Sequence, residues 1–453
     1  MAVSPPPIMI RMRYSRSILL LVTLLLVATI ACSEPSPDFT PVDTPQPTTS
    51  SSDTTPTVFG YTHHRPDGNR LASGRGALPT APPIDIPLDG VPVWLVAAGS
   101  GSGSVWVAIL DDGRAQGFVV DQSGWKPIAV VPDRLPVSMP PLLRLEGGEV
   151  RIITAGKTAS SLTHPVPISD QGHLAYIDKS GDLVLDGDLE ETTLPLSALP
   201  DARILADGSG RLLLLSDATG HYAHGAQGDT LEAKTVALVD PTGPTVEYDT
   251  IAIPATGVVE GISLIWADLD GDGTREIIAT VSDVAGGAHV VVYNETGKLV
   301  AEGPDVGSGF RWRHQIAVAP FGPDGELELA VMLSPHIGGV VEFYRMRDGR
   351  LDIVARLPGP TSHVNGSRNL DMALAGDLDG DGRTELLVLS RGLTKLIGVR
   401  RTVSGAEEAW SVETGGRVST NIAAVETANG GMAIGVGRAD EMLRIWQATV
   451  KEE

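Results

Sequence analysis

The 453-residue sequence contains a single cysteine, Cys32, and no excess of basic residues. One cysteine cannot form an intramolecular disulfide, so stability must come from a buried core and from bound ions. The formal net charge is −22, which makes nucleic acid and anionic lipid surfaces poor partners. Beyond the N-terminal segment, apolar residues nowhere recur at helical spacing over three turns. The sequence also lacks a serine nucleophile elbow, a phosphate loop and a Rossmann glycine pattern.

The N-terminus has the features of a targeting segment. Arg11, Arg13 and Arg16 precede an almost unbroken apolar run over residues 18–31, which is short for a membrane span. The run ends in Thr-Ile-Ala-Cys32, which resembles the lipobox of bacterial lipoproteins. The resemblance implies that residues 1–31 are a signal peptide and that lipidated Cys32 anchors an extracytoplasmic protein at the cell surface or in the periplasm. An ordinary secretory signal with an incidental cysteine is the alternative.

The rest of the chain divides by composition. Residues 32–57 are rich in Pro, Ser and Thr, which predicts a disordered tether. Residues 58–83 form an irregular N-terminal segment, and residues 84–453 carry a repeat. Because all marked units belong to one array, we expect a single domain.

Two nearly identical loops reveal the repeat. They run from Asp268 to Glu276 and from Asp377 to Glu385, and each reads Asp-Leu-Asp-Gly-Asp-Gly before its final glutamate. Carboxylates stand at positions 1, 3, 5 and 9, a density of hard oxygen ligands that suits calcium. An EF-hand would need a bidentate glutamate at position 12 and flanking helices, and the chain has neither.

Glycines in equivalent turns recur 45 to 63 residues apart, and these anchors are Gly103, Gly148, Gly210, Gly273, Gly325, Gly382 and Gly431. Four short strand patterns accompany the best-marked anchors, as in one antiparallel blade. We therefore predict an all-β fold, a single β-propeller of seven blades, with six or eight as alternatives. Because a propeller must close its edges, residues 84–88 or 58–61 should supply the outer strand of the last blade.

These loops resemble the FG-GAP/VCBS repeats, best known from the β-propellers of integrin α chains. The resemblance implies two structural Ca²⁺ sites. The ligands it implies are Asp268, Asp270, Asp272, the Thr274 carbonyl and Glu276 in one loop, and Asp377, Asp379, Asp381, the Arg383 carbonyl and Glu385 in the other. The intervening loop has Pro320 and Gly322 in place of two carboxylates and is not expected to hold metal.

A second group of residues lies in loops that should open on the face opposite the acidic loops. It comprises Arg311, Trp312, Arg313, His314, His336, His363, Asn365, Arg368, Asn369 and Asp371. Arginine and histidine stand out in so acidic a chain and would suit an anionic or hydroxyl-rich ligand. Polar groups that only satisfy strand ends, and a transition-metal site from three histidines, are alternatives.

The sequence thus predicts a binding or interaction module for a protein or a glycan. It should contact the membrane only through the lipid anchor, bind no nucleic acid and be monomeric. The alternative is a carbohydrate-active lyase or hydrolase that uses the histidine and arginine cluster, and an assembly platform is a third possibility.

Overall fold

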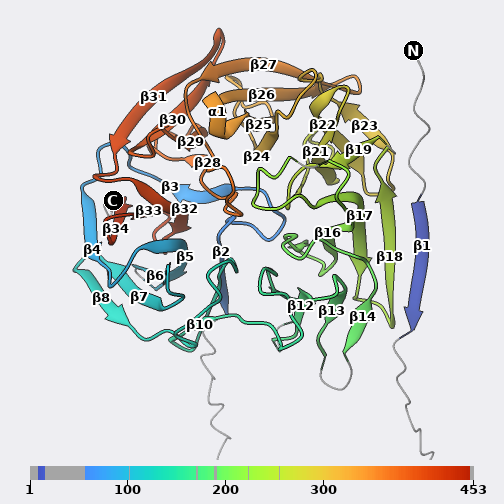
Figure 1. Ribbon diagram of the computed structural model, residues 1–453. Coiled ribbons are helices and arrows are strands. Elements are labelled where there is room, and N and C mark those ends of the chain that lie inside the picture. Colours follow the sequence, from blue (N-terminus) through green and yellow to red (C-terminus); the bar gives the residue numbers. More distant parts are fainter. Residues whose placement is uncertain are drawn as a thin grey trace, which may run out of the picture.

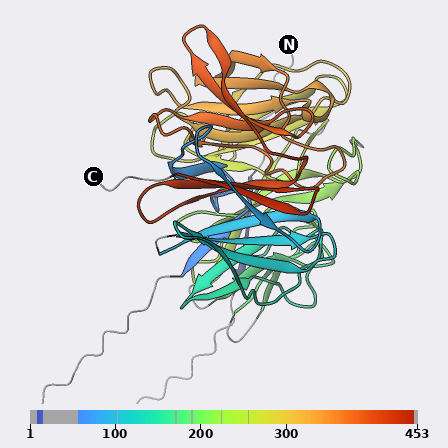
Figure 2. The same ribbon diagram turned by 90° about the vertical axis from the view of Figure 1, so that its left-hand side faces the viewer.

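The structure, a computed structural model, describes residues 9–15 and 57–448, apart from residues 102, 170–171, 188–190, 223 and 255. Small antiparallel sheets are arranged radially around one axis (Figure 1), and the side view shows a disc (Figure 2). This confirms the predicted all-β propeller. The one helix among the described residues is the four-residue turn α1 (Pro335–Gly338).

Strand pairing and chain order divide the ring into eight blades, which we number along the chain. Blade 1 contains β5 (Pro92–Ser100), β6 (Gly103–Leu110), β7 (Ala115–Asp121) and β8 (Gly124–Ile128), and blade 2 contains β9 (Leu142–Glu146) and β10 (Glu149–Ile152). Blade 3 contains β11 (Val166–Pro167), β12 (Leu174–Ile177), β13 (Leu183–Leu185) and β14 (Thr192–Leu194). Blade 4 contains β15 (Leu205–Ala206), β16 (Leu212–Thr219), β17 (Glu232–Asp240) and β18 (Thr245–Ala252). Blade 5 contains β20 (Ile265–Ala267), β21 (Glu276–Asp283), β22 (Gly287–Asn294) and β23 (Leu299–Glu302), and β19 (Gly257–Val259) lies beside β21. Blade 6 contains β24 (Arg313–Ala319), β25 (Glu328–Leu333), β26 (Val340–Arg347) and β27 (Arg350–Pro358). Blade 7 contains β28 (Leu374–Asp377), β29 (Glu385–Leu389), β30 (Lys395–Thr402) and β31 (Gly405–Glu413). Blade 8 contains β32 (Val418–Glu426), β33 (Met432–Arg438), β34 (Met442–Gln447) and β4 (Pro83–Pro87).

The expected number of seven blades is therefore corrected to eight, which was one of the alternatives. The overlooked unit is blade 3, whose strands are two to four residues long. It lies between the anchors Gly148 and Gly210, and its turns, such as Asp178-Lys-Ser-Gly-Asp182, lack the Asp-Gly-Asp-Gly pattern of the marked loops. Short strands joined by weakly marked turns give little periodicity to detect.

The last blade is closed by the N-terminal part of the chain. Strand β4 pairs with β34 along residues Pro83 to Pro87, which confirms the prediction that a segment near residues 84–88 completes this blade. The other candidate, β2, lies elsewhere: Val58–Tyr61 pairs with β9 in blade 2. Joining the N-terminal strand β4 to the last sheet closes the ring at this point.

Residues 58–75 fill the axis of the ring, and we call this segment the plug. Figure 1 shows β2 and β3 (Leu71–Arg75) inside the ring, and β3 pairs in parallel with β28 of blade 7. Asn69 donates to and accepts from the backbone of Val318 in blade 6, at 2.9 and 3.0 Å. The plug therefore links blades that are far apart in the sequence.

Packing between blades forms the core. The first three strands of a blade are largely buried, whereas an outer strand such as β31 is mostly exposed. Trp106, Trp266 and Trp446 are at most 2% exposed and fill spaces between neighbouring sheets. Gly435 is required opposite Trp106, because a Cβ there would lie 2.4 Å from the indole ring.

The part of the chain expected to be targeting sequence and tether is described only at residues 9–15. There β1 (Met9–Ser15) pairs antiparallel with β18 at the outside of the ring (Figure 1). Cys32 and the tether over residues 32–57 lie outside the described residues, save Thr57. Among the described helices, none has the length and hydrophobicity needed to cross a bilayer.

Candidate functional sites

The two faces of the ring are defined by the strand order. Turns between first and second strands, and between third and fourth strands, open on one side, and the remaining loops open on the other. We call the first side, which carries loops 268–275 and 378–384, the acidic-loop face. The other carries loops 220–231, 303–312, 334–339 and 359–373, and we call it the histidine face.

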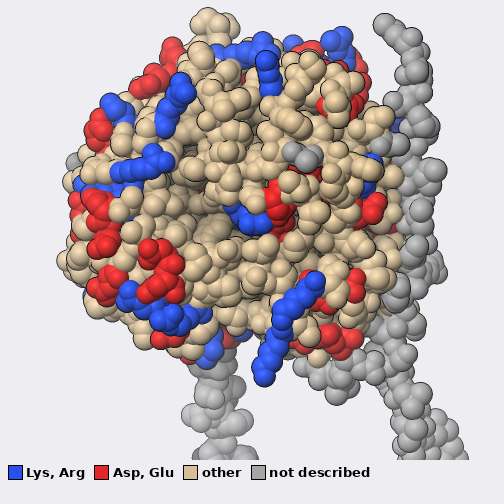
Figure 3. All heavy atoms as spheres, viewed as in Figure 1, with Lys and Arg blue, Asp and Glu red and all other residues tan. Residues whose placement is uncertain are grey.

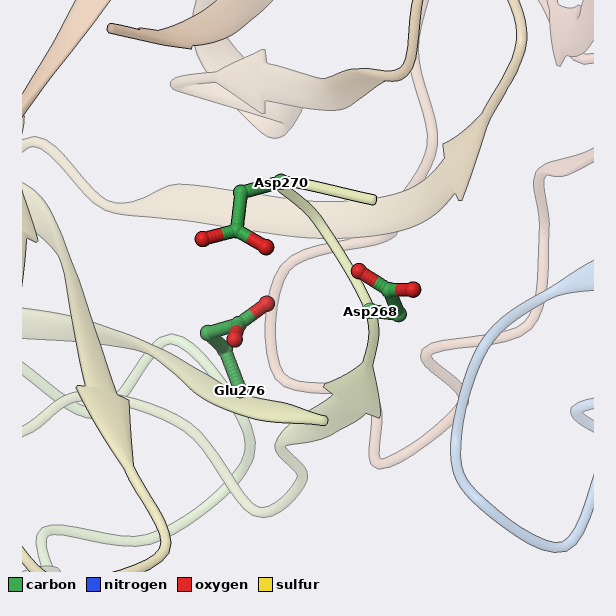
Figure 4. Close-up of side chains that lie close together, drawn as sticks. All are labelled: Asp268, Asp270 and Glu276. Atoms are coloured by element: carbon green, nitrogen blue, oxygen red, sulfur yellow. The ribbon is translucent and has the colours of Figure 1, made fainter. Parts of the chain in front are cut away.

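The acidic loop of blade 5 brings three carboxylates together (Figure 4). Ligand atoms of Asp268, Asp270 and Glu276 all lie within 4.8 Å of one another. Asp268 accepts the backbone amides of Gly271 and Gly273 at 2.6 and 3.0 Å, so the positive-φ glycines wrap the turn around the carboxylate. Asp272 is not part of this cluster; its Oδ1 accepts the amide and hydroxyl of Thr274 at 2.7 and 2.6 Å.

Electrostatics also favour a cation in this loop. Burial, and then the charges of Asp270, Asp268 and Asp272, raise the pKa of Glu276 to about 7. A hard divalent cation would remove this repulsion, because oxygen ligands at this density are what such ions bind. The residues of blade 5 therefore fit a metal ion.

The corresponding loop of blade 7 contains an internal cation. Asp377, Asp379 and Glu385 again cluster within 4.8 Å. However, the guanidinium of Arg400 lies 2.7 Å from Asp379 and 2.9 Å from Asp381, and it also bonds Glu385. Arg400 thus supplies positive charge where a metal ion would supply it.

Blade 6 follows the pattern of blade 7. Arg345, from the same strand position as Arg400, pairs with Glu326 at 2.6 Å and with buried Glu328. In blade 5 the equivalent position is Asn294, which faces Glu276 in the β21–β22 ladder and caps its own turn. Blade 5 is therefore the one of these three loops without an arginine from the third strand.

On the histidine face, aromatic rings form a contiguous row. Trp312 stacks on His314 and contacts His363 edge-on, both at 5.0 Å between centroids. His336 lies 6.0 Å from His363 and 6.2 Å from His224, whose ring stacks on Phe310 at 5.0 Å. The structure thus places the three predicted histidines in one group and adds His224 to them.

Several residues expected to contact a ligand are buried instead. Trp312 is 1% exposed and donates its indole N–H to the Glu260 carbonyl at 3.1 Å, so it is a core residue and not a ligand platform. His314 is equally buried and bonds the Ser362 hydroxyl at 2.9 Å. Arg313 is 2% exposed and pairs with Glu342 at 3.0 Å.

The remaining predicted residues are divided between surface and interior. Arg311 and Asn365 are exposed, whereas Asn369 is buried and accepts the amide of Asp371. Arg368 is half-buried and bridges Asp201 and Asp229, each at 2.6 Å. Because Arg313 and Arg368 are both satisfied within the protein, neither is available to hold a substrate carboxylate.

Asp371 lies in the axis and not on the face. It is fully buried and pairs with Arg70 of the plug at 2.8 Å and with Arg203 at 3.2 Å. Burial alone would raise the pKa of Asp371, but the guanidinium groups of Arg203 and Arg70 outweigh it and hold that pKa well below its usual range. The predicted site residue is thus the anion that joins the plug to the blades.

Sequence analysis missed His224 and Glu260. His224 stands in the loop over residues 220–231, which crosses toward blade 7: Gly366 donates its amide to the Ala226 carbonyl at 2.8 Å. Glu260 is 2% exposed and bonds both His224 Nδ1 and the Ser282 hydroxyl. A twelve-residue connection between two strands was the available signal, because long loops in compact domains are usually functional.

Exposed apolar side chains surround this group. Phe310 is 52% exposed, Ile337 66% and Val364 36%, and they adjoin Trp312, His336 and His363 closely in sequence. On the face turned to the viewer, Figure 3 shows acidic and basic side chains meeting near the centre of the ring within a largely uncharged surface. A cavity of about 550 Å³ lies instead on the acidic-loop face, between the plug and residues 97–101 and 424–428.

Buried Glu232 predicts a pH dependence of stability. Burial and the nearby Glu260 raise the pKa of Glu232 to about 9. Between the unfolded pKa of about 4.3 and this value, the folded state retains a proton that the unfolded chain releases, so stability falls as pH rises. Replacing Glu232 with glutamine should therefore have little effect at pH 4.5. At pH 8 it should stabilise the protein by more than about 1 kcal/mol.

Urea unfolding at several pH values measures this difference. Glu408→Gln, at an exposed position of β31, is the matched control and should give parallel curves. A Glu232→Gln effect that is constant from pH 4.5 to 8 would contradict the assignment.

Comparisons with known proteins support the architecture only. No protein-family model matches the chain, and no curated protein matches its sequence. A europium-containing methanol dehydrogenase is similar in structure, with a TM-score of 0.51 and 8% identity over 83% of this chain and 89% of its own. BamB from Moraxella catarrhalis has a TM-score of 0.39 and 12% identity over 82% and 98% of the two chains. The WD40 domain of Toxoplasma gondii coronin has a TM-score of 0.39 and 10% identity over 84% and 90%. The chain is a β-propeller, a fold consistent with an interaction module, and its FG-GAP/VCBS resemblance remains a prediction carried by two loops.

Proposed function

We propose that the protein is an extracytoplasmic binding module, anchored through lipidated Cys32, that binds a protein partner on the histidine face. The observation that carries this proposal is the set of exposed apolar residues Phe310, Ile337 and Val364, which stand in three loops of the histidine face. Contiguous exposed apolar groups with a polar rim are typical of protein-binding surfaces.

The geometry favours a protein over an acidic glycan. Two of the three predicted arginines, Arg313 and Arg368, are paired internally, and Trp312, which could stack on a sugar ring, is buried. The geometry also argues against a lyase or hydrolase, because His314, a candidate general base, is 1% exposed.

The place where the tether joins the propeller also favours partner binding on the histidine face. Val58 pairs with Leu145 next to the turn at residues 147–148, so the chain enters the plug from the acidic-loop face. A lipid-anchored tether that ends there leaves the histidine face accessible to partners.

We further propose that Ca²⁺ stabilises the acidic-loop face through Asp268, Asp270 and Glu276, with Asp272 and the Thr274 carbonyl as nearby oxygens. The loop of blade 7 should bind Ca²⁺ more weakly, because an ion there competes with Arg400. In this proposal the ion organises the turn and takes no part in a reaction.

Photo-crosslinking in the source cells tests the proposed face. A photoreactive residue at Ile337 in the full chain should yield a defined crosslinked protein. The same residue at Val403, 93% exposed in the β30–β31 turn on the acidic-loop face, should not. Equal products from the two positions, or none from Ile337, would argue against a protein partner on the histidine face.

A further inference from the structure

Three histidines on this face come from three separate loops. His224 lies in loop 220–231, His336 in α1 and His363 in loop 359–373. Their ring centroids are 6.2 and 6.0 Å apart along the row. His336 is half-buried and reaches the surface, whereas His363 is 1% exposed.

The hydrogen bonds of two of these rings leave a nitrogen lone pair unused. His363 Nε2 lies 2.8 Å from the Ser367 carbonyl, which can only accept, so Nε2 carries the proton. His363 Nδ1 is then an acceptor, and it is buried without a partner. His224 Nδ1 bonds the carboxylate of Glu260, so in the neutral ring the free lone pair is on Nε2.

The third ring completes the set. His336 Nδ1 is also buried without a hydrogen-bond partner. The neutral form of imidazole is the form that binds metal.

We propose that His224, His336 and His363 bind one divalent transition-metal ion, such as Zn²⁺, with Glu260 as a positioning residue. Metal-binding histidines almost always donate their other N–H to a carboxylate or a backbone carbonyl, as His224 and His363 do here. Glu260 also contributes negative charge beside the ion. The site lies on the face proposed to bind a partner, but metal binding there requires neither that partner nor the acidic loops.

The ligand nitrogens do not yet converge. Among the described residues, only the two acidic loops bring three ligand atoms within 4.8 Å of one another. The proposal therefore requires the rings to rotate when the ion binds. His336 lies on a four-residue helical turn, and its Nδ1 has no hydrogen bond to break. His314 is left out because, among the described residues, its ring contacts Trp312 and His363 and not His336 or His224.

Cobalt titration of the full chain, with calcium in excess to occupy the acidic loops, tests the proposal. One equivalent of Co²⁺ should produce the visible absorption of a tetrahedral nitrogen-containing site, and Zn²⁺ should displace it. His336→Gln should weaken Co²⁺ binding by at least about tenfold, and Glu260→Gln by about 10–100-fold. His221→Gln, an exposed position three residues before His224, is the matched control and should bind as the wild type does.

His336 is half-exposed, so His336→Gln should fold normally, and its melting temperature checks this. A tetrahedral spectrum that persists unchanged in His336→Gln and His363→Gln would overturn the proposal. So would the weak spectrum of an octahedral, oxygen-bound ion in the wild type.

Discussion

Replacing Asp371 with alanine is expected to destabilise the protein by about 3–5 kcal/mol, because the change leaves two buried guanidinium groups without their anion. Asp371 is fully buried, and its partners Arg70 and Arg203 are 1% and 2% exposed. Arg70 belongs to the plug, so the variant should also loosen the plug from the blades. Urea unfolding gives the loss of stability, and hydrogen exchange of residues 62–72 shows whether the plug is released.

Asp112→Ala provides the control for this prediction. Asp112 also pairs with an arginine, Arg114 at 2.5 Å, but both side chains are more than 40% exposed. Exposed pairs contribute little, so the variant should unfold as the wild type does. If Asp371→Ala were equally harmless, the axial ion cluster would not hold the plug.

Calcium is expected to stabilise the wild-type protein mainly through blade 5. At a free concentration 100 times the dissociation constant, binding to the folded state alone adds about 2.7 kcal/mol. Asp270→Asn removes a charged oxygen ligand and should abolish most of this gain. Asp324→Asn, in the arginine-neutralised loop of blade 6, should leave the gain unchanged. Melting temperatures with calcium and with a chelator measure each variant.

Arg400→Gln should increase the stabilising effect of calcium, through the loop of blade 7. Without the guanidinium, Asp379, Asp381 and Glu385 repel one another, so the variant should lose stability in chelator. Added calcium should restore that stability, giving a larger calcium effect than in the wild type. A calcium effect that Arg400→Gln leaves unchanged would show that Arg400 does not substitute for the ion.

Local sequence was sufficient to predict the acidic loops, and ring closure reduced the closing strand to two candidates. The carboxylates of blade 5 lie within nine consecutive residues, and their turn is set by Gly271 and Gly273. Strand β4 was predictable because a closed ring needs an outer strand for blade 8. Blade 3 was not, since its strands are too short to show a period.

Contacts between distant residues could not be predicted in this way. Arg70 and Asp371 are 301 positions apart, and nothing near either one indicates that they meet in the axis. Trp312 and His314 sit among polar loop residues, which suggested exposure, yet the loop over residues 359–373 covers them. Only the folded arrangement shows that His224, and not His314, lies beside His336.

Thiol labelling on membranes of the source cells tests most directly the claim that the histidine face is occupied by a partner. Cys32 is the only cysteine in the sequence, so Ile337→Cys or Val403→Cys would introduce the one additional thiol. Cys at position 403 should react with a maleimide in both membranes and purified protein. Cys at position 337 should react when purified but be protected in membranes. Equal labelling of the two positions in membranes would contradict it.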